Sequence, residues 1–294
     1  MAQKPVANAL TLELEPVVLE ELRRHLDTED IWYAHDYVPF DQGENFAFLG
    51  GRDWETSDTT LPRHITDALE ILLITKDNLA GYHRELVEHF ILEDKWGRWL
   101  GRWTAEEHLH AVALRNYLVV TREVDPTANE DVRVEHVMKG YRADRLTQIE
   151  TLVFMAFFER SHAVFTRNAE AQTPEPVLRG LLGRIAADEE RHTVFFANLV
   201  AHCLGTAHAE TVAAIDAVPP LLGHGEGVGS NAWAVSAERS TTGKPLLAND
   251  PHLGVTQPGI WYQMGLHCRE VSDACLQYWG GMGFMWDNHI SRAY

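Results

Sequence analysis

Residues 103–110 read Trp-Thr-Ala-Glu-Glu-His-Leu-His, and residues 186–192 read Ala-Ala-Asp-Glu-Glu-Arg-His. Each stretch holds an acidic residue followed by Glu-x-x-His, and each lies in a long segment with few helix breakers. Because residues three apart share one face of a helix, each Glu-x-x-His can hold a metal ion. The two pairs are Glu107 with His110 and Glu189 with His192. A single copy would indicate an ordinary charged helix surface, but two copies favour a metal site.

A third acidic residue, Glu159, lies in an apolar segment. Its neighbours along the chain include Val153, Phe154, Phe157, Phe158 and Phe165. Burying a carboxylate among such side chains is costly unless a cation pairs with it. Bundles that hold two metal ions take a Glu-x-x-His from two helices and one Glu from each of two others. Oxygen-rich ligands with one imidazole per ion suit iron or manganese better than zinc or copper.

The segments around these residues predict an all-α fold. Apolar residues recur at helical spacing, and no alternating strand pattern occurs before residue 217. We expect helices over about 11–27, 62–90, 96–121, 130–141, 146–172 and 176–203, and a loop over about 38–63. Long helices in this number are typical of a helical bundle. Because the composition changes after Asp216, we expect a bundle over residues 1–216 and an irregular tail over 217–294 that is not an independent domain.

Composition narrows the function classes. The formal net charge of −18 disfavours nucleic acid and anionic membranes as partners. No apolar run is long enough to span a membrane and no signal-peptide core precedes the first helix, so we expect a cytoplasmic protein. The three cysteines form no CxxC pair and are odd in number, which indicates neither disulfides nor a zinc site.

The motifs resemble those of a known family. The runs WTAEExxH, AFxER and AADExRH, in this order, are similar to those of the soluble acyl-carrier-protein desaturases, close to their actinobacterial branch. The resemblance also covers Trp32-x-x-x-Asp36-Tyr37-Val38-Pro39 and runs through residues 1–216. It implies a ferritin-like four-helix-bundle core with extra helices.

The resemblance also implies a role for each site residue. Glu107 and Glu189 would bridge two irons, His110 would bind one iron, and Glu159 and His192 would bind the other. Asp188 would orient His110, with Trp32 beside it. The family uses O2 and ferredoxin-type electron donors to insert a cis double bond into a fatty acyl chain on acyl carrier protein. The implied protein is thus a homodimeric, iron-dependent oxidoreductase of fatty acid biosynthesis.

The chain departs from the family pattern at two positions. The family's first-helix ligand belongs to an Ile-Thr-Glu-Glu run, and Lys76 occupies the ligand position here. Its ammonium could replace a metal ion, or its side chain could extend outward to solvent. Asp77 could substitute as a ligand, but it lies about 100° further around the helix. The second departure is His162, where plant relatives carry a small hydroxyl residue near the O2 site.

Two stretches of the tail resemble unrelated families. Residues 228–265 are similar to the start of the β-chain of penicillin-acylase-like N-terminal nucleophile hydrolases, in which cleavage before Ser230 would create the nucleophile. Residues 271–294 are similar to the C-terminus of acyl-CoA dehydrogenases. Both matches are too short to form an active site, so we expect inert fragments.

Three functional hypotheses follow. The first is an acyl-carrier-protein desaturase-like oxidoreductase with two irons. The second is a protein that binds acyl carrier protein or an acyl chain, holds one ion of iron or manganese, and does not desaturate. Lys76 favours the second hypothesis, and the metal content per subunit separates the two. The third, a remote alternative, is an N-terminal nucleophile amidase that cleaves itself before Ser230.

Overall fold

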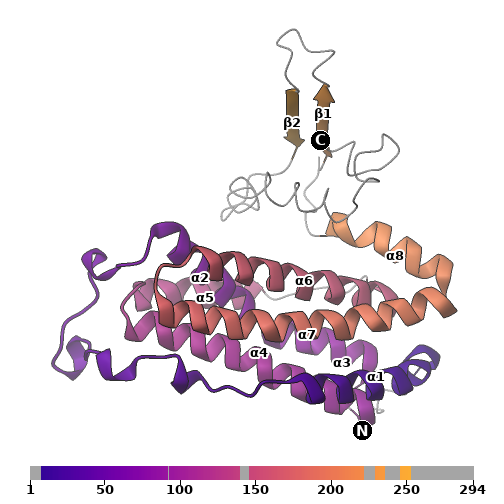
Figure 1. Ribbon diagram of the computed structural model, residues 1–294, viewed down its shortest axis with the longest axis horizontal. Coiled ribbons are helices and arrows are strands. Elements are labelled where there is room, and N and C mark those ends of the chain that lie inside the picture. Colours follow the sequence, from indigo (N-terminus) through magenta and orange to yellow (C-terminus); the bar gives the residue numbers. More distant parts are fainter. Residues whose placement is uncertain (1–7, 92, 140–145, 222–228, 236–245, 253–294) are drawn as a thin grey trace. The chain divides into compact units, whose positions relative to one another are not determined.

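The computed structural model describes residues 8–91, 93–139, 146–221, 229–235 and 246–252 (Figure 1). Contacts within the chain divide it into two units, Met1–Val218 and Pro219–Tyr294.

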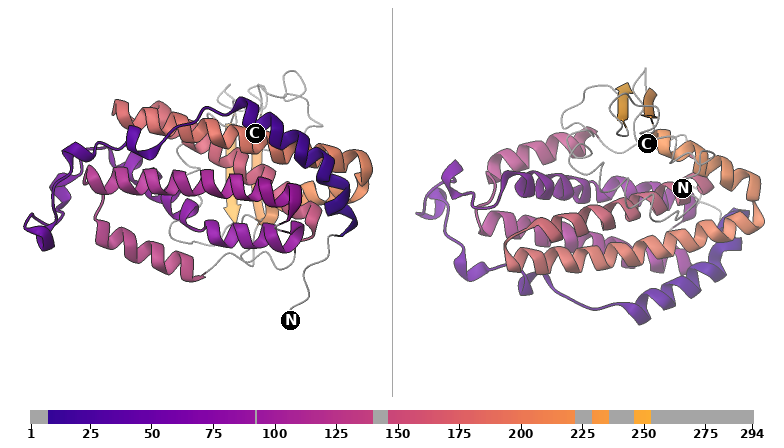
Figure 2. Two further views of the ribbon diagram at one scale, coloured as in Figure 1. Left: turned by 90° about the horizontal axis from the view of Figure 1, so that it is seen from below. Right: turned by 45° about the horizontal axis from the view of Figure 1, so that its top comes forward.

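The first unit is a helical bundle, as the sequence predicts. Its helices are α1 (Ala9–Thr28), α2 (Arg63–Asp77), α3 (Leu79–Phe90), α4 (Asp94–Val120), α5 (Pro126–Lys139), α6 (Gln148–Gln172) and α7 (Pro176–Thr206), and α8 (His208–Leu221) follows α7. Helices α4, α6 and α7 run alongside one another, and α1 contacts both α4 and α7 (Figures 1 and 2). Four short 3₁₀ turns lie between α1 and α2, and three of them lie in the segment 38–63 that the sequence predicts as loop.

Local chemistry fixes where the long helices begin. Thr147 and Glu150 form a capping box at the start of α6, so that two backbone N–H groups gain side-chain acceptors. The Glu175 carboxylate accepts hydrogen bonds from the N–H groups of Val177 and Leu178 at the start of α7. Pro176 occupies the first turn of α7, where its missing N–H costs nothing.

The predicted single helix over residues 62–90 is two helices in the structure. Asn78 ends α2 and precedes α3, with φ −80° and ψ 10°. Its N–H is bonded to the carbonyl of Thr75, three residues earlier, rather than in the regular α-helical pattern. Asparagine competes poorly for helix interiors because its amide offers the backbone alternative partners. The break falls two residues after Lys76.

Two apolar clusters form the core of the bundle. The first contains Trp96, Trp99 and Trp103 of α4, and Trp99 stacks on Phe195 with ring centroids 3.5 Å apart. The second is built around Leu69, Leu72, Leu114 and Leu181, and it includes Trp32. Trp103 and Trp32 both direct their indole N–H groups to buried carboxylates, of Glu159 and Asp188 respectively. The two clusters therefore border a polar interior.

No helix in the described ranges combines the length and apolar character that crossing a bilayer requires.

In the second unit, β1 (Gly229–Val235) pairs antiparallel with β2 (Leu246–His252), from Gly229 opposite His252 to Val235 opposite Leu246. The tail is thus not irregular over these residues, because the two segments satisfy each other's backbone groups. The rest of the stretches that resemble hydrolases and dehydrogenases lies outside the described residues.

Candidate metal centre

Four helices bring a cluster of ionisable side chains to the middle of the bundle. Lys76 comes from α2, Glu107 and His110 from α4, Glu159 from α6, and Glu189 and His192 from α7. Each of these residues is at most 1% exposed to solvent. All five ligands predicted from the sequence thus lie together, although 85 residues separate the first from the last.

One part of the cluster has the arrangement of a metal site. Glu107, Glu159, Glu189 and His192 each offer a ligand atom, and these four atoms lie within 4.8 Å of one another. His192 Nδ1 is 3.5 Å from Glu159 Oε2 and 4.0 Å from Glu189 Oε2. These three atoms are buried and have no hydrogen-bond partner within the described part of the chain. A bound cation would satisfy all three.

Lys76 occupies the other part of the cluster. Its Nζ lies 2.9 and 2.7 Å from the two oxygens of Glu107 and 2.5 Å from Glu189 Oε1. His110 faces the same oxygens, with Nδ1 3.4 Å from Glu107 Oε1 and 3.0 Å from Glu189 Oε1. The ammonium therefore sits where a cation bound by His110, Glu107 and Glu189 would sit. The alternative in which Lys76 extends to solvent is wrong, because Lys76 is 1% exposed.

His162 completes the surroundings of Lys76. Its Nδ1 lies 3.4 Å from Lys76 Nζ, and its ring packs on Phe158 with centroids 4.1 Å apart. An ammonium can only donate, so this nitrogen of His162 is the acceptor and the imidazole is neutral. The two positions at which the sequence departs from the family pattern are therefore in contact.

Asp77 does not join the cluster. Its carboxylate pairs with the guanidinium of Arg115 on α4, and its side chain is 13% exposed. The helical phase explains this, since one residue further along α2 turns the side chain about 100° away from Lys76. The prediction of Asp77 as a substitute ligand does not fit this placement.

The acidic residue that precedes each Glu-x-x-His motif forms a hydrogen bond with the histidine of the other motif. Asp188 of α7 lies 2.9 Å from His110 Nε2 on α4, and it also accepts a hydrogen bond from the Trp32 indole at 2.9 Å. Glu106 of α4 lies 2.8 Å from His192 Nε2 on α7. The family resemblance implied a role for Asp188 but none for Glu106. The shared acidic-Glu-x-x-His pattern could have indicated it, because the first acidic residue of each motif serves the histidine of the other.

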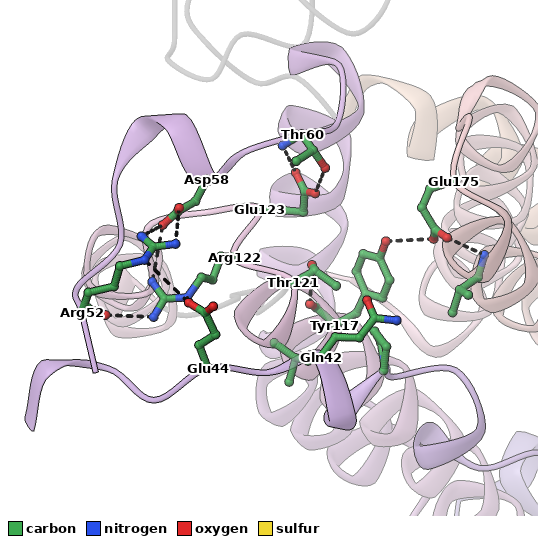
Figure 3. Close-up of a pocket in the computed structure, with 13 residues that line it drawn as sticks. Gln42, Glu44, Arg52, Asp58, Thr60, Tyr117, Thr121, Arg122, Glu123 and Glu175 are labelled. Atoms are coloured by element: carbon green, nitrogen blue, oxygen red, sulfur yellow. Dashed lines mark hydrogen bonds and ion pairs between the residues drawn. The ribbon is translucent and has the colours of Figure 1, made fainter. Parts of the chain in front are cut away.

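A second group of polar residues lines a cavity of about 390 Å³ near the ends of α4 and α7 (Figure 3). Arg122 is 6% exposed, and it donates to the backbone oxygens of Arg52, Asn45 and Asp53. Arg52 forms two hydrogen bonds to Asp58, at 2.8 and 2.6 Å. The charged groups here are paired with one another and fasten the loop to the bundle. This cavity is separate from the cluster around Lys76.

Comparisons with known proteins agree with this geometry. The sequence model of the family described as "Fatty acid desaturase" matches residues 7–220. The chain belongs to this family. The match spans the whole bundle, including every ligand predicted from the sequence.

Two mycobacterial proteins and one solved structure place the chain within the family. It is 77% identical over 217 residues to a Mycobacterium tuberculosis protein provisionally named acyl-[acyl-carrier-protein] desaturase DesA2, covering 74% of this chain and 79% of that protein. It is 39% identical over 206 residues to the similarly named DesA1, covering 67% and 60%. The X-ray structure of DesA2 superposes with a TM-score of 0.63 at 65% identity, covering 74% of this chain and 79% of that one. These relatives place the chain in the actinobacterial branch of the acyl-carrier-protein desaturases.

The residues of this family member do not fit two irons. Such a centre needs four carboxylates and two histidines, and Lys76 stands in place of one carboxylate. A single ion fits better. Ligand atoms about 2.1 Å from one ion are at most about 4.2 Å apart. The separations of 3.5 and 4.0 Å between His192 Nδ1 and the free oxygens of Glu159 and Glu189 meet this limit.

Electrostatics keep Lys76 charged. Burial alone would lower the pKa of the ammonium, but the charges of Glu107 and Glu189 outweigh it and raise the pKa above its ordinary value. Burial alone would raise the pKa of Glu107, but Lys76 and the two histidines hold it well below the usual range. Burial, and then the charge of Glu107, raise the pKa of Glu189 although Lys76 lowers it. The charged lysine beside the ionised Glu107 behaves as a built-in cation.

His162 predicts a pH dependence of stability in the metal-free protein. Burial, and then the charge of Lys76, lower the pKa of the His162 imidazole to about 4 from an ordinary value of 6.5. Between these values the unfolded chain binds a proton that the folded chain does not, so stability falls as the pH drops from 6.5 towards 4. The loss from this residue is up to about 3 kcal/mol.

Urea unfolding of metal-free protein at several pH values tests this effect. Between about pH 4.5 and pH 6.5, the free energy of unfolding of His162→Gln should depend less steeply on pH than that of the unmodified chain. His64→Gln replaces an exposed histidine and should keep the original slope. Equal slopes for the His162 variant and the unmodified chain would contradict the prediction.

Proposed function

We propose that this desaturase-family chain binds a fatty acyl group presented by acyl carrier protein, beside a centre that takes a single metal ion. The placement of the Lys76 ammonium between Glu107 and Glu189 carries the proposal. The names of the mycobacterial relatives support acyl carrier protein as the partner. Glu159, Glu189 and His192 would hold the ion, with Glu107 shared between the ion and Lys76.

The charge of the cluster supports one ion. Three buried carboxylates, those of Glu107, Glu159 and Glu189, need at most three positive charges. Lys76 supplies one, and a single divalent ion supplies the other two. The carboxylates outweigh burial and raise the pKa values of His110 and His192, and any proton on these rings leaves still less negative charge for a second ion. A second divalent ion would leave an excess of two positive charges in a site that excludes water.

Iron or manganese suits this set of ligands. A bound ion would supply a redox-active or Lewis-acidic group next to the acyl chain. The chain's own residues orient the ligand His192 through Glu106, while Asp188 holds His110 beside Lys76 in the other half of the cluster.

Desaturation that uses O2 and a ferredoxin-type electron donor is the second candidate. Family membership and the full set of five predicted ligands favour it. It would require two ions, and hence displacement of Lys76 from between the carboxylates. The homodimer implied by the family stays a prediction under either function.

Metal analysis of the unmodified protein separates the two functions. After reconstitution with excess Fe(II) or Mn(II) and desalting, we expect close to one ion per chain by inductively coupled plasma mass spectrometry. In parallel, stearoyl-loaded acyl carrier protein should bind more tightly than the unloaded carrier, and no unsaturated product should form with O2 and reduced ferredoxin. Two tightly bound ions with unsaturated product would overturn the proposal in favour of desaturation. Equal binding of the loaded and unloaded carriers would overturn the acyl-binding part.

A further inference from the structure

A histidine outside the Glu-x-x-His motifs is connected to the centre through one intervening carboxylate. His25 lies on α1 and is completely buried. Its Nε2 is 3.0 Å from the carboxylate of Glu106, which in turn lies 2.8 Å from His192 Nε2. The rings of His25 and His192 stack with centroids 5.7 Å apart and planes within 14°. His25 thus approaches the centre from a helix that supplies none of the proposed ligands.

His25, Glu106 and His192 could themselves be taken for a second metal site, because their ligand atoms lie within 4.8 Å of one another. Arg102 argues against this. Its Nε donates to Glu106 Oε1 at 2.6 Å, so the carboxylate already has a cation partner. Another cation beside the guanidinium would be repelled. The cluster is therefore a hydrogen-bonded support.

The protonation pattern of this support follows from hydrogen-bond chemistry. Glu106, paired with Arg102, is an ionised carboxylate and can only accept hydrogen bonds. Both histidines must then present Nε2–H to it. A neutral imidazole that carries its proton on Nε2 has its lone pair on Nδ1. For His192, Nδ1 is the atom directed at the free oxygens of Glu159 and Glu189.

We infer that His25 is a positioning residue that, through Glu106, holds His192 in the tautomer that binds metal. A parallel arrangement on the other motif supports the inference. Asp188 receives the Trp32 N–H and an arginine, Arg191, while it supports His110. Glu106 likewise receives His25 and an arginine, Arg102, while it supports His192. His25 is therefore the counterpart of Trp32.

This inference rests on the proposed single-ion centre, and its test uses two readouts. The first is the affinity of the metal-free protein for Mn(II), followed by electron paramagnetic resonance. His25→Leu should weaken binding about 10–100-fold, which is typical when a residue supporting a metal ligand is removed. His25→Gln places an amide N–H near the position of Nε2 and should restore most of the affinity. Leu22→Ala, in the core on the same helix, should lower thermal stability without changing the affinity.

The second readout is the tautomer of His192 in metal-free protein, from ¹⁵N chemical shifts of its ring. It is taken at a pH above the pKa of His192, because the carboxylates of Glu106, Glu107 and Glu159 outweigh burial and raise that pKa well above its ordinary value. We expect the Nε2–H form in the unmodified chain and in His25→Gln, and a mixture of forms in His25→Leu. If His25→Leu fails to fold, His25→Asn replaces it, because its shorter amide falls short of Glu106. Failure of the unmodified chain to bind Mn(II) would count against the proposed function, while the tautomer would still test the role of His25. The inference would be overturned if His25→Leu (or His25→Asn) kept the affinity and the tautomer of the unmodified chain, or if His25→Gln did not restore them.

Discussion

Replacing Lys76 with glutamate should raise the metal content from one ion to two per chain. The substitution removes the positive charge between Glu107 and Glu189 and returns a fourth carboxylate to the cluster. His110 Nδ1, now 3.0 Å from Glu189 Oε1, would then face a cation instead of sharing that oxygen with the ammonium. Four carboxylates balance two divalent ions, so the second ion enters without excess charge.

The measurement is metal per chain after reconstitution and exhaustive desalting, for the Lys76→Glu variant and the unmodified protein side by side. Lys139→Glu is a matched control, because Lys139 pairs with Glu135 on the exposed surface of α5. It carries the same change in net charge and should leave the metal content at one. A Lys76→Glu variant that still retains a single ion would show that something besides the ammonium excludes the second one.

Lys76→Met should cost about 3–5 kcal/mol of stability in the metal-free protein. Methionine keeps most of the length of the side chain but removes the partner of two carboxylates that are at most 1% exposed. Removing one member of a buried ion pair has this cost because the remaining charge is left without compensation. The three hydrogen bonds that Nζ donates to carboxylate oxygens are lost as well.

Urea unfolding followed by circular dichroism gives the free energies. Lys139→Met removes an exposed ion pair and should change stability by less than about 1 kcal/mol. Excess Mn(II) should recover much of the loss in Lys76→Met, since a ligand that binds only the folded state stabilises it. A loss no greater than that of the Lys139 variant would mean that Glu107 and Glu189 do not depend on the ammonium.

The sequence predicted the helical bundle and the five clustered ligands because both depend on short-range spacing. Glu107 and His110 share a helix face wherever the helix packs, and an isolated acid such as Glu159 in an apolar segment needs a buried partner. The position of Lys76 in the family's motif also marked it as a residue of the site, but the sequence left open whether its ammonium enters the site or extends to solvent. These features are fixed by positions along one helix at a time.

The features that the sequence did not predict depend on how the helices pack together. Nothing in the amino-acid sequence near His25 distinguishes it from a surface histidine, since its partner Glu106 lies 81 residues away. From the sequence, Asp77 is a reasonable substitute ligand, but in the folded chain it pairs with Arg115 on α4. The sequence does not reveal the break at Asn78, because asparagine is tolerated in many helices and the apolar spacing continues across it.

The Lys76 side chain also changes what a chelator can do to this protein. In a centre with two ions, chelation exposes four buried carboxylates to one another at once. Here one of the positive charges is part of the polypeptide and cannot be extracted. Chelation would leave Glu107 and Glu189 still bound to the Lys76 ammonium, with Glu159 held by the Trp103 N–H at 2.8 Å. The apoprotein would therefore keep a largely ordered interior, and loading and stripping of the remaining ion would be reversible.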